Sequence, residues 1–154
     1  TGSSPEAQLI INNGKAVVHP IAGTFKRTGN DETDKKETER LLKDAKENAV
    51  LNNLSHTSFF AGDVIAICND DFFKLHGKPD VIITDPPRAG MHEKLVRKIL
   101  DMEAPTVVYV SCNPATQARD LSLLSEKYTI GKIQPVDMFP HTHHIECVVL
   151  LKLK

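Results

Sequence analysis

Cys112 is the residue of this 154-residue chain whose surroundings best suit nucleophilic chemistry. It lies two residues after an apolar run over residues 106–110, which predicts a strand, and Pro114 then opens a predicted helix. The amino-terminal end of a helix carries partial positive charge, which favours the nucleophilic thiolate form of cysteine. Taken alone, Cys112 is better explained as a buried structural cysteine, since cysteine is among the most often buried residue types.

Polar motifs stand at the ends of three predicted strands. DPPRAG (85–90) follows one apolar run, SCNPATQARD (111–120) overlaps and follows another, and DMFPHTHHIE (137–146) leads into a third. Ligands of open α/β sheets bind outside the carboxyl ends of the strands, so we expect a functional site where these motifs meet. Taken alone, Asp85 is also explained as a turn residue before proline, and Arg88 as solvated surface.

The elements that must position these motifs alternate between strand and helix, which implies βαβ units in a doubly wound α/β sheet. Apolar periodicity and turn residues predict strands over 57–60, 80–84, 106–110, 128–133 and 145–153, helices over 31–53, 91–101 and 114–124, and a hairpin over 7–18 that turns at Asn12-Asn13-Gly14.

The central strands are expected to be buried on both faces, because their apolar runs are unbroken. The expected core residues are Val81, Ile82, Ile83, Val107, Val108, Val110, Val148, Val149 and Leu150.

Charge and cysteine usage narrow the function classes. Lys and Arg number 19 against 20 Asp and Glu, a formal charge of −1, so any nucleic-acid affinity must come from a local basic face. The three cysteines have no CxxC spacing, so neither a disulfide framework nor a structural zinc site is expected. His141, His143, His144 and Cys147 do not have a usual ligand spacing either, so we expect no metal.

Targeting signals are not expected in this sequence. No apolar run reaches the length of a membrane span, and the first residues lack the basic-then-apolar layout of a signal peptide. We therefore expect a cytoplasmic protein without membrane contact.

The three motifs, in this order and spacing, resemble the catalytic part of the RNA uracil-5-methyltransferases, particularly the bacterial 23S rRNA type, over about residues 44–154. The resemblance implies a partial Rossmann-like methyltransferase sheet with helices on both faces, S-adenosylmethionine as cofactor and an rRNA uridine as substrate. It implies that Cys112 adds to carbon 6 of uracil and that Glu146 is the base that removes the carbon 5 proton.

The same resemblance implies further site residues. Asp63 and Asp85 match cofactor-contacting positions of the family. Arg88, Arg119 and His141 are candidates for contacting RNA phosphate or the flipped base.

One expected feature of such an enzyme is missing. A Rossmann-like methyltransferase holds its cofactor with a glycine-rich loop after the first strand, yet no two of the eight glycines stand in a Gly-x-Gly relation. The acidic ribose-binding position and the family's N-terminal RNA-binding module are also lacking. A catalytically incomplete module that cannot hold cofactor, or one that a partner chain completes, is therefore the alternative.

The segment before residue 45 resembles a different family, the chorismate-binding core of anthranilate synthase component I, over about residues 2–47. His19, Gly23 and Thr24 stand at matching positions, but Ala49-Val50-Leu51 replaces the segment with the magnesium-binding Glu. We therefore expect a chorismate-enzyme-like hairpin and helix over residues 1–44 and an incomplete methyltransferase domain over 45–154, an arrangement that suggests a chimera. A chorismate-binding fragment is the weakest functional alternative.

Overall fold

A computed structural model describes residues 7–12, 15–19, 30–60, 64–138, 140–142 and 144–154. Its strands are β1 (Ala7–Asn12), β2 (Lys15–His19), β3 (Thr57–Phe59), β4 (Val81–Asp85), β5 (Thr106–Ser111), β6 (Tyr128–Val136) and β7 (Glu146–Leu153). Its helices are α1 (Asp31–Leu51), α2 (Val64–Ile67), α3 (Asp70–His76), α4 (Glu93–Met102) and α5 (Pro114–Leu124).

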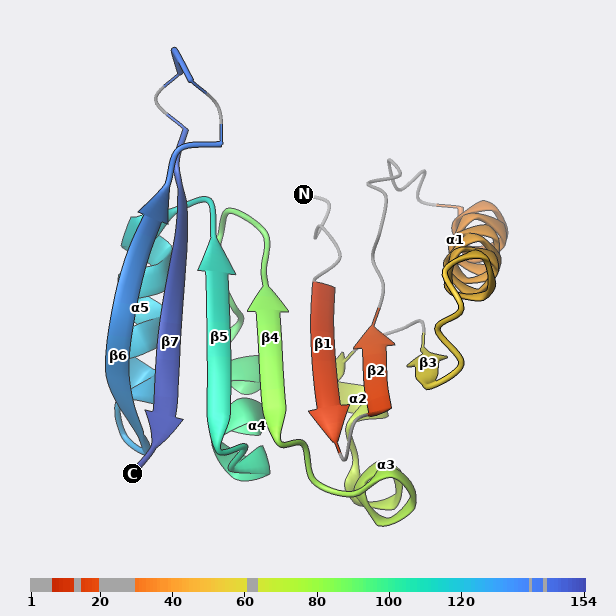
Figure 1. The fold of residues 1–154 in the computed structure, drawn as a ribbon, viewed down its shortest axis with the longest axis horizontal. Helices are drawn as coiled ribbons and strands as arrows, with labels where there is room; N and C mark the ends of the chain where they lie inside the picture. Colours follow the sequence, from red (N-terminus) through yellow and green to blue (C-terminus); the bar gives the residue numbers. More distant parts are fainter. Residues whose placement is uncertain (1–6, 13–14, 20–29, 61–63, 139, 143) are drawn as a thin grey trace.

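The described strands form one seven-stranded sheet in the order β3-β2-β1-β4-β5-β7-β6 (Figure 1). β4 and β5 are parallel, while β7 is antiparallel to both β5 and β6. Helices follow β4 and β5, and α4 connects the two parallel strands as one βαβ unit. The α/β class, the Rossmann-like sheet and the N-terminal hairpin and helix are confirmed.

The hairpin joins the interior of the sheet. Asn12 pairs with Lys15, as a two-residue turn requires, although the Asn13-Gly14 turn itself lies outside the described residues. β1 then pairs antiparallel with β4, and Ala7 lies opposite Asp85. The amino-terminal end of β1 therefore lies beside the carboxyl end of β4, and the two carboxyl ends point in opposite directions.

Helix ends follow from local side chains. Asn30 caps α1, and its Oδ1 accepts hydrogen bonds from the amides of Glu32 and Thr33 at 3.0 and 3.3 Å. α5 begins at Pro114, as predicted, and Asn113 caps it by accepting from the Ala115 amide at 3.2 Å.

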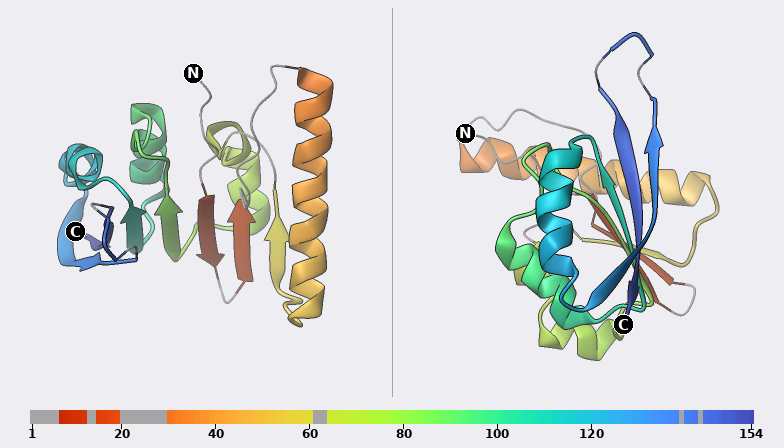
Figure 2. Two further views of the ribbon diagram at one scale, coloured as in Figure 1. Left: turned by 90° about the horizontal axis from the view of Figure 1, so that it is seen from above. Right: turned by 90° about the vertical axis from the view of Figure 1, so that its left-hand side faces the viewer.

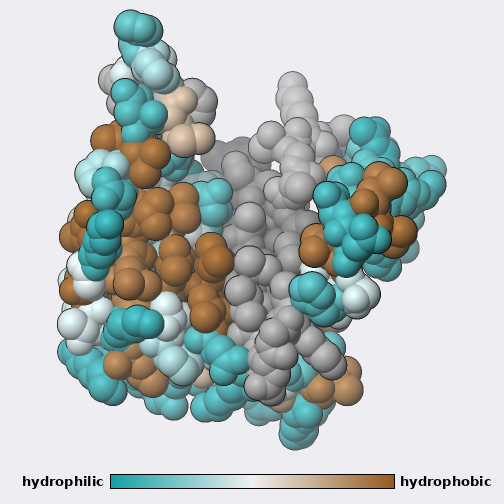
Figure 3. All heavy atoms as spheres, in the orientation of Figure 1, coloured by the Kyte–Doolittle hydropathy of each residue, from teal (hydrophilic) through white to brown (hydrophobic). Residues whose placement is uncertain are grey.

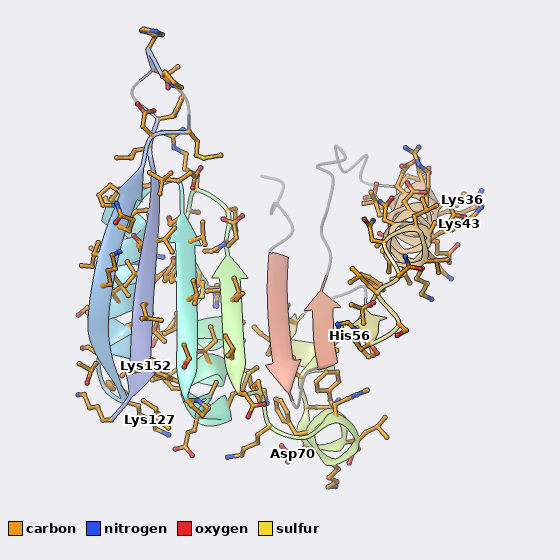
Figure 4. The ribbon with its side chains drawn as sticks, viewed as in Figure 1. Lys36, Lys43, His56, Asp70, Lys127 and Lys152 are labelled. Atoms are coloured by element: carbon orange, nitrogen blue, oxygen red, sulfur yellow. The ribbon has the colours of Figure 1, made fainter. Side chains whose placement is uncertain are left out.

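Helix α1 lies beside the β3 edge of the sheet (Figure 2). Exposed i,i+4 ion pairs, such as Lys36–Glu32 and Lys43–Glu47, line it, and both lysines point away from the sheet (Figure 4). Such exposed pairs contribute only a few tenths of a kcal/mol each.

Helices α2 to α5 all lie on one face of the sheet, whereas helices were expected on both faces (Figure 2). Burial alternates accordingly along the central strands. Residues that face the helices are almost inaccessible, such as Ile82, Val107 and Val149 at 0–1% exposure. Their neighbours on the other face are only half-buried: Val81, Ile83, Val108, Val110, Val148 and Leu150.

The prediction of strands buried on both faces was therefore wrong for these residues. An unbroken apolar run is compatible with burial on both faces, but the described elements supply helices for only one. Apolar side chains are visible on the uncovered face over β4, β5 and β7 (Figure 3).

Candidate active site

Cys112 and Glu146 meet at one edge of the sheet. The last pairs of the antiparallel β5–β7 ladder are Val110 with Val148 and Ser111 with Cys147. Cys112 directly follows β5 and Glu146 is the first residue of β7, so both lie at the same end of this ladder.

Asp85 ends the neighbouring strand β4 at the same edge. Asp85 lies on the same face of the sheet as Ile83, the face that the helices do not cover. Its side chain is exposed at the end of the strand. Partial burial of its carboxyl group nevertheless raises the pKa of Asp85. Burial also raises the pKa of Glu146, and the negative charge of Asp85 raises it further, which places the two carboxyl groups within electrostatic reach of each other.

Cys112 differs from the other two cysteines in its access to solvent. Cys68 and Cys147 are buried, and burial raises the pKa of both thiols. Cys112 is half-buried, directly after β5 and two residues before α5. The turn around it is fixed by the buried Ser111 hydroxyl, which accepts a hydrogen bond from the Asn113 amide at 3.1 Å.

The predicted RNA-contacting residues occupy three different environments. Arg88 is exposed, and its Nη1 lies 3.5 Å from Nδ1 of His144, which joins the loop after β4 to the loop before β7. Arg119 has a side chain 55% exposed, yet its Nη2 donates to the carbonyls of Ala89 and Met91 at 3.1 Å. His141 is exposed, with a φ of 69°, in the β6–β7 loop that projects beyond the sheet (Figure 1).

The structure thus brings Cys112, Glu146 and Asp85 to one edge, with Arg88 on the adjoining loop. Asp63, the second predicted cofactor contact, lies outside the described residues, as does His143.

Two buried polar residues of α5 were missed by the sequence analysis. Gln117 is 2% exposed, and its Nε2 donates to the carbonyls of Tyr109 and Cys147 at 3.0 Å, so it bridges β5 and β7 beneath the site. Asp120 is 1% exposed and binds the loop after β4. Neither could be predicted from sequence, because polar residues in an amphipathic helix are usually exposed.

The described residues only partly fit S-adenosylmethionine. Asp85 is available at the carboxyl end of β4, where a Rossmann-like sheet binds its ligand. The strand next to Asp85 is the antiparallel β1, which begins at Ala7 beside Asp85. The described residues therefore do not supply, beside Asp85, the loop that would follow the carboxyl end of a parallel strand. The full sequence also lacks a Gly-x-Gly pair.

The described residues contain neither a membrane-spanning helix nor a metal-binding group of side chains. No described helix is long and apolar enough to cross a membrane. Within the described ranges, no group of three or more His, Cys, Asp or Glu side chains is placed to hold a metal ion.

Relatives of the chain were found by sequence and by structure. An uncharacterized RNA methyltransferase of Bacteroides thetaiotaomicron is 58% identical over 113 residues, which are 73% of this chain and 25% of that protein. One from Porphyromonas gingivalis is 57% identical over 112 residues, 71% of this chain and 24% of that protein. The chain spans about a quarter of the length of these relatives.

A solved structure is also similar. It is the Pyrococcus abyssi tRNA (uracil-54, C5)-methyltransferase in complex with S-adenosyl-L-homocysteine, with a TM-score of 0.62 and 37% identity, and the match covers 73% of this chain and 26% of that one.

A family model settles the assignment. The model described as tRNA (uracil-5-)-methyltransferase matches residues 19–154. The resemblance of residues 2–47 to anthranilate synthase component I is not supported by these comparisons. The chain belongs to the tRNA (uracil-5-)-methyltransferase family of S-adenosylmethionine-dependent enzymes.

Proposed function

We propose that this chain carries the nucleophile and the base of an RNA uracil-5-methyltransferase. The Cys112 sulfur bonds to carbon 6 of the uracil ring, and the electron pair of the 5,6 double bond moves to make carbon 5 nucleophilic. S-adenosylmethionine supplies the methyl group in this family. Once carbon 5 is methylated, the Glu146 carboxylate takes its proton, the double bond re-forms and the sulfur leaves.

The observation that carries this proposal is the register of β5 and β7. The ladder ends with Ser111 paired to Cys147, so the half-buried Cys112 and the Glu146 carboxyl group both come next to this last pair, which supports their joint action on one ring. The raised pKa of Glu146 supports its assignment as the base, because a carboxylate with a higher pKa holds a proton better near neutral pH.

We propose that the substrate is an rRNA uridine that leaves its stack to reach Cys112. Arg88, His141 and the exposed part of Arg119 are candidates for holding the RNA. The whole protein is expected to work in the cytoplasm.

A second candidate function is a methyltransferase-like module that cannot hold the cofactor by itself. The antiparallel β1 beside Asp85 and the missing glycine-rich loop favour it. In this case Asp63 and Asp85 contact S-adenosylmethionine only when further segments or a partner chain complete the site.

Two measurements separate the candidates. Calorimetric titration with S-adenosylmethionine tests the cofactor site, and micromolar binding, about 8 kcal/mol, excludes the second candidate. Transfer of a labelled methyl group to an rRNA fragment tests the chemistry: we expect labelling by the unmodified chain and by the control Cys68→Ala, and none by Cys112→Ala. Equal labelling by Cys112→Ala contradicts the covalent mechanism.

A further inference from the structure

Helix α5 holds the loop after β4 by its backbone. The Arg88 carbonyl accepts hydrogen bonds from Asn113 Nδ2 at 3.0 Å and from Thr116 Oγ1 at 3.2 Å. Farther along the loop, Arg119 Nη2 donates to the carbonyls of Ala89 and Met91 at 3.1 Å. The first turns of α5 therefore contact the loop at three successive points.

Asp120 is the buried centre of this contact. Its side chain is 1% exposed, and its Oδ2 accepts from the Met91 amide and from the Tyr109 hydroxyl, both at 2.7 Å. Its Oδ1 accepts from Nε and Nη2 of Arg119 at 2.9 and 2.8 Å. A buried carboxylate is stable only when it is paired and fully hydrogen-bonded, and these four bonds meet that requirement.

Gly90 shows how closely the loop approaches α5. Its φ is +78°, and a Cβ built there would lie 2.6 Å from Arg119 Nη2 and 2.8 Å from Asp120 Oδ2. A side chain at position 90 is therefore excluded both by the backbone conformation and by the two clamping side chains.

We propose that Asp120, paired with Arg119, is a positioning residue that fixes the loop that follows Asp85 and carries Arg88 relative to Cys112. The same helix begins two residues after Cys112, so α5 connects both sides of the site. The inference rests on the proposed function, since it assigns Asp120 a role in arranging that site.

Asp120→Asn is the direct test, and Tyr109→Phe is its matched control. Asparagine keeps the shape but presents an NH2 group to one of the present donors, whereas phenylalanine removes a donor to the same carboxylate and leaves the loop bonds intact. We expect amide hydrogen exchange at Met91 to accelerate about 10- to 100-fold in Asp120→Asn and to stay unchanged in Tyr109→Phe. We expect kcat to fall as much as about 100-fold in Asp120→Asn, with KM nearly unchanged, because misplaced catalytic groups cost this much.

The proposal is overturned if Asp120→Asn accelerates exchange at Met91 no more than Tyr109→Phe does, or if it accelerates exchange without lowering kcat. If Asp120→Asn does not fold, Arg119→Lys tests the proposal instead. The Arg119 side chain is 55% exposed, so its replacement is expected to leave the chain folded. Faster exchange at residues 89–91 supports the clamp, and unchanged exchange refutes it. An unmodified chain without methyl transfer would contradict the proposed function, while the exchange data would still test the clamp on their own.

Discussion

Glu146 and Asp85 are two like-charged groups at the rim of one sheet edge, and this affects stability as well as chemistry. Burial and the charge of Asp85 raise the pKa of Glu146 above its unfolded value. The folded state therefore binds the Glu146 proton more tightly than the unfolded state does. The resulting stabilisation is present at low pH and is lost as pH rises through the folded pKa.

Glu146→Gln should accordingly raise the free energy of unfolding at pH 7, because it removes a carboxylate that the folded state disfavours. Urea unfolding at pH 7 and at about pH 3 measures this, and the difference should disappear at about pH 3, well below the unfolded pKa, where the acid is protonated in both states.

Glu103→Gln is the control with the opposite sign, since Lys127 and Lys78 lower the pKa of Glu103. It should reduce stability at pH 7. A destabilising effect of Glu146→Gln at neutral pH would contradict the proposed electrostatics.

At the scale of elements, β4 is covered on one face and open on the other. Ile82 is 1% exposed among the helices, while Ile83, the next residue, is half-buried on the uncovered face. Ile82→Ala should lower the free energy of unfolding by about 3 kcal/mol, and Ile83→Ala by about 1 kcal/mol, because only the first leaves a closed cavity.

Denaturant unfolding of both variants measures the two losses in the free energy of unfolding. Because both variants replace isoleucine in the same strand, each is the control for the other. Equal losses would mean that the second face is covered as well, for example by self-association, and the concentration dependence of the midpoint would then reveal it.

Elements with strong local signals were predictable from sequence. Pro114 and the Asn113 cap define the start of α5, and the two apolar runs around Asn-Gly predict the hairpin. The short helices α2 and α3 were not predicted, because periodicity over four to seven residues is weak. The insertion of β1 between β2 and β4 was also beyond local reasoning, because it depends on pairing between distant segments.

The candidate site shows the same division. The strand-end motifs correctly located Asp85, Cys112 and Glu146 at one edge. The bond from Met91 to Asp120 spans 29 residues of sequence, so only the folded chain shows which buried carboxylate organises the loop.

At the scale of the whole molecule, one hydrophobic core on the helical side holds the described chain together. Cys68 lies in it at 0% exposure, and burial raises the pKa of its thiol to about 11, with Lys98 opposing the shift. Ionising this thiol in the folded state places a negative charge in the apolar core, where it is poorly solvated. Its contribution to stability is therefore present below about pH 9, the unfolded value, and is lost toward pH 11.

The free energy of unfolding should fall between these pH values, with about 2 to 3 kcal/mol of the fall due to Cys68. Cys68→Ala and Cys68→Ser change the core differently, yet both should flatten this alkaline decline by a similar amount. An unchanged slope in both variants, measured by urea unfolding at several pH values, would place the thiol outside the core.

The central claim is that Cys112 and Glu146 act as nucleophile and base on the same uracil. Glu146→Gln, incubated with S-adenosylmethionine and an rRNA fragment, tests it on a denaturing gel. Blocking proton removal should leave the sulfur bonded to carbon 6, so we expect a protein–RNA band that survives denaturation and is absent from the double variant Cys112→Ala/Glu146→Gln. The same band in the double variant, or no band from Glu146→Gln under conditions where the unmodified chain methylates, would contradict the account.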